Sequence, residues 1–274
     1  MQRKWVGHQR LSILHVLWCQ RFLPSRSQHV ADRLGAPAVG TFSWDEEREW
    51  LELFDRIIAS DNWDSAVESV KGDERIHAEL MASLSEAEEA FKEAFPNFES
   101  EIQLRIGPLL QIWEAQGPGL LLQLRELLRF DRLDETQVFL LQPVLGGFGR
   151  AHPPNDAVQF EAVLANEDPR LPESLRVAWL FAQVALGKIV GAQTTTVSLR
   201  LACLPAVLQA GEELGVTMYR PEVLEAACSH WMPESSLSGD TIEKLMPLWE
   251  EACSQEQAGT RMKEQVLALG IDEP

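Results

Sequence analysis

The sequence predicts an α+β fold that is predominantly α-helical, with one small antiparallel β-hairpin or sheet near residues 136–166. Over most of the chain, apolar residues recur at intervals of three and four, which is the period of a helix with one buried face. Around residues 136–166, two short segments rich in Val, Phe and Leu flank a Gly- and Pro-rich stretch, a pattern typical of paired strands. With 274 residues and 45% apolar content, the chain is long enough to bury a large core.

The first part of the chain differs from the rest in charge. Residues 1–44 hold six Lys or Arg and one acid, which leaves 18 Lys or Arg and 41 acids for residues 45–274. Three interpretations are open: a weak secretory signal, an organelle presequence or membrane-surface helix, and an unstructured extension. The sequence favours the last, so we expect residues 1–42 to be a basic disordered segment. A single helix-rich domain follows at 43–274, with 193–274 as a candidate helical subdomain.

Helices are expected over the first half of the domain. The first begins at Ser43, which forms a capping box with Glu46. A short helix ending near residue 70 and a long one over 73–95 follow, and Pro96 ends the long one. The stretch 100–107 alternates like a strand, but it also carries a helical stripe, and the helix is favoured. A separate helix starts near Pro118, because proline suits a first helical turn.

The second half contains the predicted strands. They cover 136–145 and 156–166 and are expected to pair as a broad hairpin. Residues 171–189 then form a helix that is apolar on nearly every side, which places it at the centre of the core. Further helices are expected over 197–214, with a bend at a proline, and over 221–231, 241–253 and about 260–269.

The segment PVLGGFGRAHPPND, residues 143–156, is the best candidate for a site. Gly147 to Gly149 read G-x-G after an apolar strand, but His152 stands in place of the third glycine and prolines follow, so the dinucleotide fingerprint fails. Because G-K-S/T is also absent, a P-loop is excluded. In one interpretation the glycines and prolines form only a turn. In the other, Arg150 and His152 form an anion clamp or a proton-transfer pair, with Asn155 and Asp156 as further ligand-binding residues.

Two strands followed directly by a central helix that is apolar on nearly every side resemble the order of elements in zincin-type metallopeptidases, over about 50 residues. The resemblance implies an H-E-x-x-H motif on that helix. This chain reads LRVAWLFAQV there, and none of these side chains ligates zinc well. We therefore expect no metal site and no cofactor, and the interpretation that remains is a degenerate zincin-like scaffold.

Composition restricts compartment and partners. The four cysteines are far apart and form no C-x-x-C pair, which indicates free thiols in a reducing, cytoplasmic compartment. The net charge of −18 argues against nucleic acid as a partner, and no run of about 18 apolar residues is present to span a membrane. The oligomeric state stays open.

Two functions compete. The first is a non-catalytic protein-interaction module with another protein as its partner, because no strong catalytic or cofactor motif is present; it predicts an exposed apolar patch. The alternative is an enzyme or small-anion-binding protein centred on the Gly-rich loop 146–156. It predicts that Arg150 and His152 point inward rather than into solvent.

Overall fold

The computed structural model describes residues 5–34, 47–68, 70, 74–130, 133, 136–164, 166, 168–192, 195–233 and 237–270. It is 72% helical, with 11 helices and one small four-stranded mixed sheet among the described residues. The predicted fold class, predominantly helical α+β, is confirmed.

The sheet is mixed, and its strand order is β1-β2-β4-β3. The strands are β1 (Trp5–Gly7), β2 (Gln137–Leu141), β3 (Gly149–His152) and β4 (Ala157–Glu161). The predicted antiparallel pairing of strand 136–145 with strand 156–166 is wrong, because the corresponding strands β2 and β4 pair in parallel. The Gly- and Pro-rich stretch between them itself supplies β3, which pairs antiparallel with β4 at the edge of the sheet. The other edge strand, β1, comes from the N-terminus and pairs in parallel with β2.

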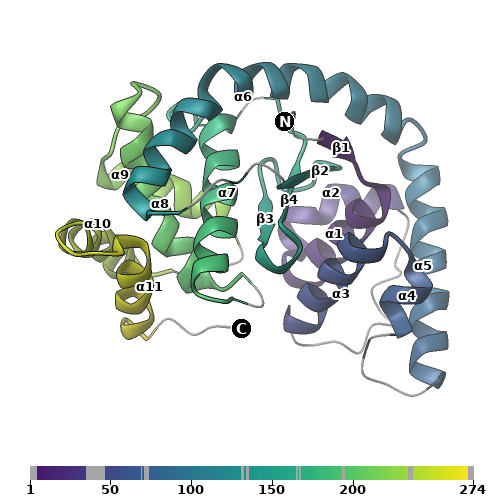
Figure 1. Cartoon of the computed structure of the whole chain (residues 1–274). Coiled ribbons are helices and arrows are strands. Elements are labelled where there is room, and N and C mark those ends of the chain that lie inside the picture. Colours follow the sequence, from purple (N-terminus) through teal and green to yellow (C-terminus); the bar gives the residue numbers. More distant parts are fainter. Residues whose placement is uncertain are drawn as a thin grey trace.

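Helices lie on both sides of the sheet (Figure 1). One group comes from the first part of the chain: α1 (Gln9–Phe22), α2 (Pro24–Leu34), α3 (Glu47–Ser60), α4 (Trp63–Glu68) and α5 (Glu74–Ala94). The other group follows the sheet: α7 (Glu173–Ile189), α8 (Val197–Glu213), α9 (Pro221–Trp231), α10 (Gly239–Cys253) and α11 (Ala258–Ala268). Helix α6 (Phe98–Leu128) arches over the top of the molecule from one group to the other.

The N-terminal segment differs from the disordered extension that the sequence predicts. Residues 5–34 form β1, α1 and α2, and nine consecutive residues of α1, from Leu11 to Cys19, are buried. Because α1 is buried on all sides, it shows no single apolar stripe, and its charged residues stand near its ends. Residues 1–4 and 35–46, which include the predicted capping box at Ser43, lie outside the described residues. That 43–274 forms one domain stays a prediction.

The length of helix α6 differs from the prediction that a separate helix starts near Pro118. The favoured helical interpretation of 100–107 is confirmed, but no new helix begins at Pro118: α6 runs unbroken for 31 residues with Pro108 and Pro118 inside it. Both prolines are exposed, so water can hydrate the carbonyl groups that lose their helical partners. Prolines on the outer side of a helix also favour its curvature around the core.

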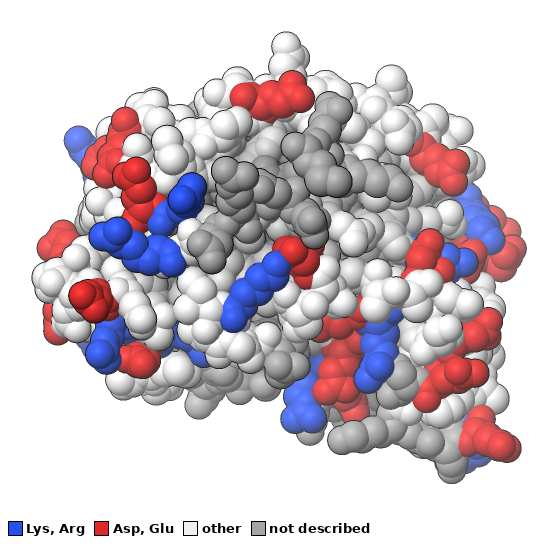
Figure 2. Space-filling model, in the orientation of Figure 1, with Lys and Arg blue, Asp and Glu red and all other residues white. Residues whose placement is uncertain are grey.

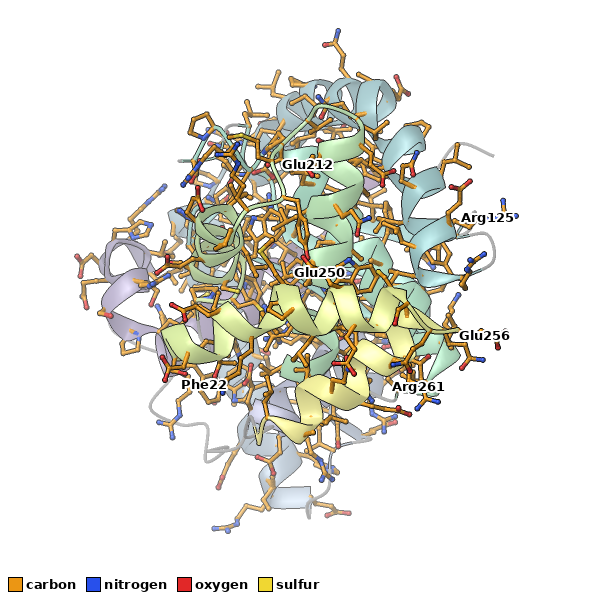
Figure 3. The ribbon with its side chains drawn as sticks, turned by 90° about the vertical axis from the view of Figure 1, so that its left-hand side faces the viewer. Phe22, Arg125, Glu212, Glu250, Glu256 and Arg261 are labelled. Atoms are coloured by element: carbon orange, nitrogen blue, oxygen red, sulfur yellow. The ribbon has the colours of Figure 1, made fainter. Side chains whose placement is uncertain are left out.

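Helices α5 and α7 to α11 begin and end within two residues of their predicted bounds, and α4 ends two residues before its predicted end. Helices α10 and α11 form an outer layer in the view of Figure 3, which labels Glu250 on α10 and Arg261 on α11. On the face shown in Figure 2, the described basic side chains are interspersed with acidic and uncharged ones. No helix in the described part of the chain is long and apolar enough to cross a membrane.

Candidate functional site

The candidate site is a buried polar layer on one face of strands β3 and β4. Because side chains alternate along a strand, Arg150 and His152 on β3 share a face, and so do Gln159 and Glu161 on β4. This face lies against α1 and α3, since the Arg150 guanidinium lies over ring systems of both helices. All four side chains are at most 4% exposed. The opposite face packs on α7, where a Cβ at Gly149 would contact Leu180.

The Gly-rich loop folds around the carboxylate of Glu161. Two of its glycines, Gly146 and Gly147, have φ values of 79° and 149°, which L side chains rarely adopt. This turn directs backbone N–H groups inward, as in other anion-binding backbone nests. The two oxygens of Glu161 accept hydrogen bonds of 2.7 to 3.3 Å from the N–H groups of Val144, Leu145, Gly147 and Phe148. These glycines therefore serve a buried side chain of the same protein.

A histidine and a cysteine of α1 extend this cluster. Nε2 of His15 lies 2.7 Å from Oε1 of Glu161, and the His15 ring stacks on Phe148. Sγ of Cys19 lies 3.6 Å from Nδ1 of His15. The order Cys, His, Glu is that of a nucleophile with its base and orienting acid. However, burial, together with the charge of Glu161, raises the pKa of the wholly buried Cys19 thiol well above its usual value, which keeps it protonated and unreactive.

The hydrogen bonds of Glu161 predict that the stability of the protein depends on pH. Burial alone would raise the pKa of Glu161, but the hydrogen bond and charge of His15 and the loop N–H groups hold it below its ordinary value. Stability from such a carboxylate is present above its unfolded-state pKa, about 4.3, and is lost as the pH falls through the lower folded-state pKa. We expect the free energy of unfolding at pH 7 to be larger for the wild type than for Glu161→Gln. This difference between the two proteins should become smaller below about pH 4. Urea unfolding at pH 7, 5, 4 and 3 measures it, and a constant difference would contradict it.

Arg150 occupies an aromatic cage. Its Cζ atom lies 4.7 Å from the ring centroid of Trp18, 5.3 Å from that of Phe54 and 5.4 Å from that of Phe148. Nη2 donates to Oε1 of Glu47, the first residue of α3, at 3.0 Å. Nη1 is buried and has no hydrogen-bond partner within the described part of the chain. The cage fixes the guanidinium in place, and the Nη1 group stays without a hydrogen bond in the described part of the chain.

His152 pairs with an acid of α3. Its Nδ1 lies 2.7 Å from Oδ1 of Asp55, and Nδ2 of Asn155 donates to both Oδ1 and the carbonyl oxygen of Asp55 at 3.1 Å. The Asn155 amide therefore orients the carboxylate that orients the imidazole. Nε2 of His152 is buried with no partner among the described residues.

The structure brings three of the four predicted site residues together and separates the fourth. Arg150, His152 and Asn155 all contact α3. Asp156 instead adopts a left-handed backbone conformation, accepts a hydrogen bond from the Thr136 hydroxyl and forms an ion pair with Lys188. It holds the turn that leads into β4.

The sequence alone does not identify the other residues that contact the polar layer. Glu47 and Asp55 lie on an acidic amphipathic helix, where nothing distinguishes them from solvated carboxylates. Gln159 and Glu161 did leave a signal. Two polar residues at positions i and i+2 interrupt an otherwise apolar strand, and that spacing places both on one face.

The fold and the site define a helix-rich α+β protein with a buried polar layer between its sheet and two of its helices. Among the described residues, no group of three or more His, Cys, Asp and Glu side chains is placed to hold a metal ion. Comparison of the chain with family models, curated proteins and solved structures finds no match. The similarity in element order to zincin-type metallopeptidases stays a prediction.

Proposed function

We propose that the protein binds a small polar molecule between strands β3 and β4 and helix α3, and that the Asp55–His152 pair exchanges a proton with it. One observation carries the proposal. Nη1 of Arg150, Nε2 of His152 and both amide atoms of Gln159 are buried on the same sheet face without partners in the described residues. An unpaired buried polar group costs about 1–3 kcal/mol, so several together are typical of a functional site rather than of a core.

The chemistry follows from the roles of the two nitrogens of His152. If Asp55 accepts a hydrogen bond from Nδ1–H, Nε2 carries the lone pair that can take a proton from a bound molecule. An oriented Asp–His pair of this kind is a common general base. Arg150, two residues earlier on the same strand face, supplies a fixed positive charge that can stabilise negative charge on the molecule.

On the side of α3, partly exposed side chains cover the polar layer. The side chains of Glu47 and Asp55 are 18% and 19% exposed, whereas Arg150 and His152 behind them are 4% and 3% exposed. A molecule that reaches the unpaired atoms would therefore pass between α3 and β3.

Thermal unfolding of the full chain tests the proposal. The melt is followed by tryptophan fluorescence with nucleotides, divalent metals, and anionic and neutral metabolites. A ligand at 100 times its Kd should add about 2.7 kcal/mol to the free energy of unfolding. Gln159→Met should raise the midpoint of the free protein, because it removes unpaired polar atoms, and should abolish the ligand effect. Gln137→Met, at an exposed position of β2, is the matched control.

Two results would contradict the proposal. The first is that no compound of the panel shifts the midpoint. The second is that Gln159→Met lowers the stability of the free protein, which would mean that its amide group is needed by the fold.

A protein-interaction role is a second proposal, and one feature of α6 supports it. Leu104 and Leu122 are 77% and 55% exposed. They stand 18 residues apart, which is five helical turns, and therefore lie on one stripe. The exposed residues between them on this stripe carry no charge: Pro108, Gln111, Ala115 and Pro118. Light scattering over a concentration series, with Leu104→Glu/Leu122→Glu as the comparison, tests whether a second copy binds there.

The cytoplasmic location and the exclusion of nucleic acid also remain proposals. Free cysteines, three of them buried, support a reducing compartment. The excess of acidic over basic residues supports a partner other than nucleic acid.

A further inference from the structure

We propose that the molecule bound in the polar layer is a small monocarboxylate, which displaces the carboxylate of Glu47 from Arg150. This inference rests on the proposed function and specifies its ligand. Glu47 thus occupies the position that the carboxylate of the ligand would take.

The geometry of Arg150 favours a carboxylate. A guanidinium presents two parallel N–H groups that match the two oxygens of a carboxylate, and such bidentate pairs are stronger than single contacts. Glu47 uses only one of these positions, since its Oε1 contacts Nη2 while Nη1 has no partner in the described part of the chain. A free carboxylate is not attached to α3, so it can turn to accept hydrogen bonds from both Nη1 and Nη2. The aromatic cage holds the guanidinium rigid for that contact.

The charge of the layer favours a monoanion. Exchanging Glu47 for a monocarboxylate replaces one negative charge by another, and the displaced side chain, already 18% exposed at the first turn of α3, can turn to water. A phosphate dianion would add charge beside Asp55. A neutral molecule would leave Arg150 without its counter-ion, close to a second buried guanidinium. Burial, and then the charge of Arg150, lower the pKa of that neighbour, Arg200, to about 9, and the charge of Glu47 acts in the opposite direction.

The neighbours of Arg150 favour a polar substituent near the carboxylate. Gln159 is paired with Arg150 across β3 and β4, so the two side chains leave the sheet from opposite positions on the same face, and both Gln159 amide atoms are buried without partners in the described residues. His152 follows two residues later on the same face, about 7 Å further along the strand. A hydroxyl group on the carbon next to the carboxylate could therefore bond to Gln159 or to Nε2 of His152. We expect glycolate to bind more tightly than acetate.

Isothermal titration of the full chain tests the exchange, with sodium acetate, sodium glycolate and inorganic phosphate as probes at constant ionic strength. We expect saturable binding of both carboxylates and weaker binding of phosphate. Glu47→Gln removes the competing charge and should tighten glycolate binding about tenfold. Glu52→Gln, at an exposed position of the same helix, is the control and should leave the Kd unchanged. Arg150→Lys keeps the positive charge but cannot donate two parallel hydrogen bonds to a carboxylate. It should weaken glycolate binding by about tenfold or more.

The outcomes separate this inference from the proposed function. If Glu47→Gln leaves glycolate binding unchanged or weakens it, the exchange is wrong. If the carboxylates do not bind but another compound of the thermal panel does, and Gln159→Met abolishes its effect, the carboxylate inference is wrong and the proposed function holds. If neither the carboxylates nor any compound of the panel binds, both are wrong.

Discussion

Replacing Glu161 by alanine is expected to lower the free energy of unfolding by about 3–5 kcal/mol, the range for removing one partner of a buried charged network. Four backbone N–H groups and the imidazole of His15 would lose their acceptor in a place that is wholly buried. The Gly-rich loop would also lose the group that orders it. Urea unfolding followed by tryptophan fluorescence at pH 7 measures the change.

A matched variant separates this effect from a general loss of acidic charge. Glu52→Ala removes a carboxylate whose described contact is an exposed ion pair with Arg48, so its unfolding midpoint should stay close to that of the wild type. A loss below about 1 kcal/mol for Glu161→Ala would mean that the loop keeps its conformation without the carboxylate.

Deleting residues 1–34 should abolish cooperative folding. This expectation is the opposite of what a disordered N-terminal segment would imply. Seven apolar side chains of α1 are at most 2% exposed: Leu11, Ile13, Leu14, Val16, Leu17, Trp18 and Cys19. At about 1.5–3 kcal/mol for each large side chain, their burial matches or exceeds the 5–15 kcal/mol by which a typical domain is stable. The deletion also removes strand β1 from the sheet and His15 from Glu161.

Circular dichroism and thermal unfolding of the truncated chain measure this. Arg26→Ala, at an exposed position of α2, is the point-substitution control and should melt close to the wild type. A truncated chain with a cooperative melt would show that α1 adds to a core that is complete without it.

Local patterns in the sequence were sufficient for most helices. Periods of three and four, together with Pro96 at the end of α5, gave the helical elements because those signals act within one turn. They failed at Pro118. The local preference of proline for a first turn is outweighed there by the packing of the inner face of α6, from Trp113 on one side of the proline to Leu120 and Leu124 on the other.

The candidate site was only partly predictable. Arg150, His152 and Asn155 stood out because polar residues crowded a loop between apolar strands. Their partners Glu47 and Asp55 are about 100 residues away in sequence, and a contact over that distance depends on how the elements pack. Asp156 is close in sequence to the other three, but its left-handed backbone turns it toward Thr136 and Lys188.

The sequence by itself determined the helix-rich α+β class, the central position of helix α7 and the two apolar strands, because each depends on the number and spacing of apolar residues within one segment. Only the tertiary structure decided that β2 and β4 run parallel, that the Gly-rich loop encloses Glu161, and that the N-terminal residues enter the core. Strand direction and strand partners are set by hydrogen bonds between distant segments, and a helix buried on every side carries no amphipathic stripe. The physical reason is the same in each case: the deciding contacts join residues of different segments, and a local pattern does not specify them.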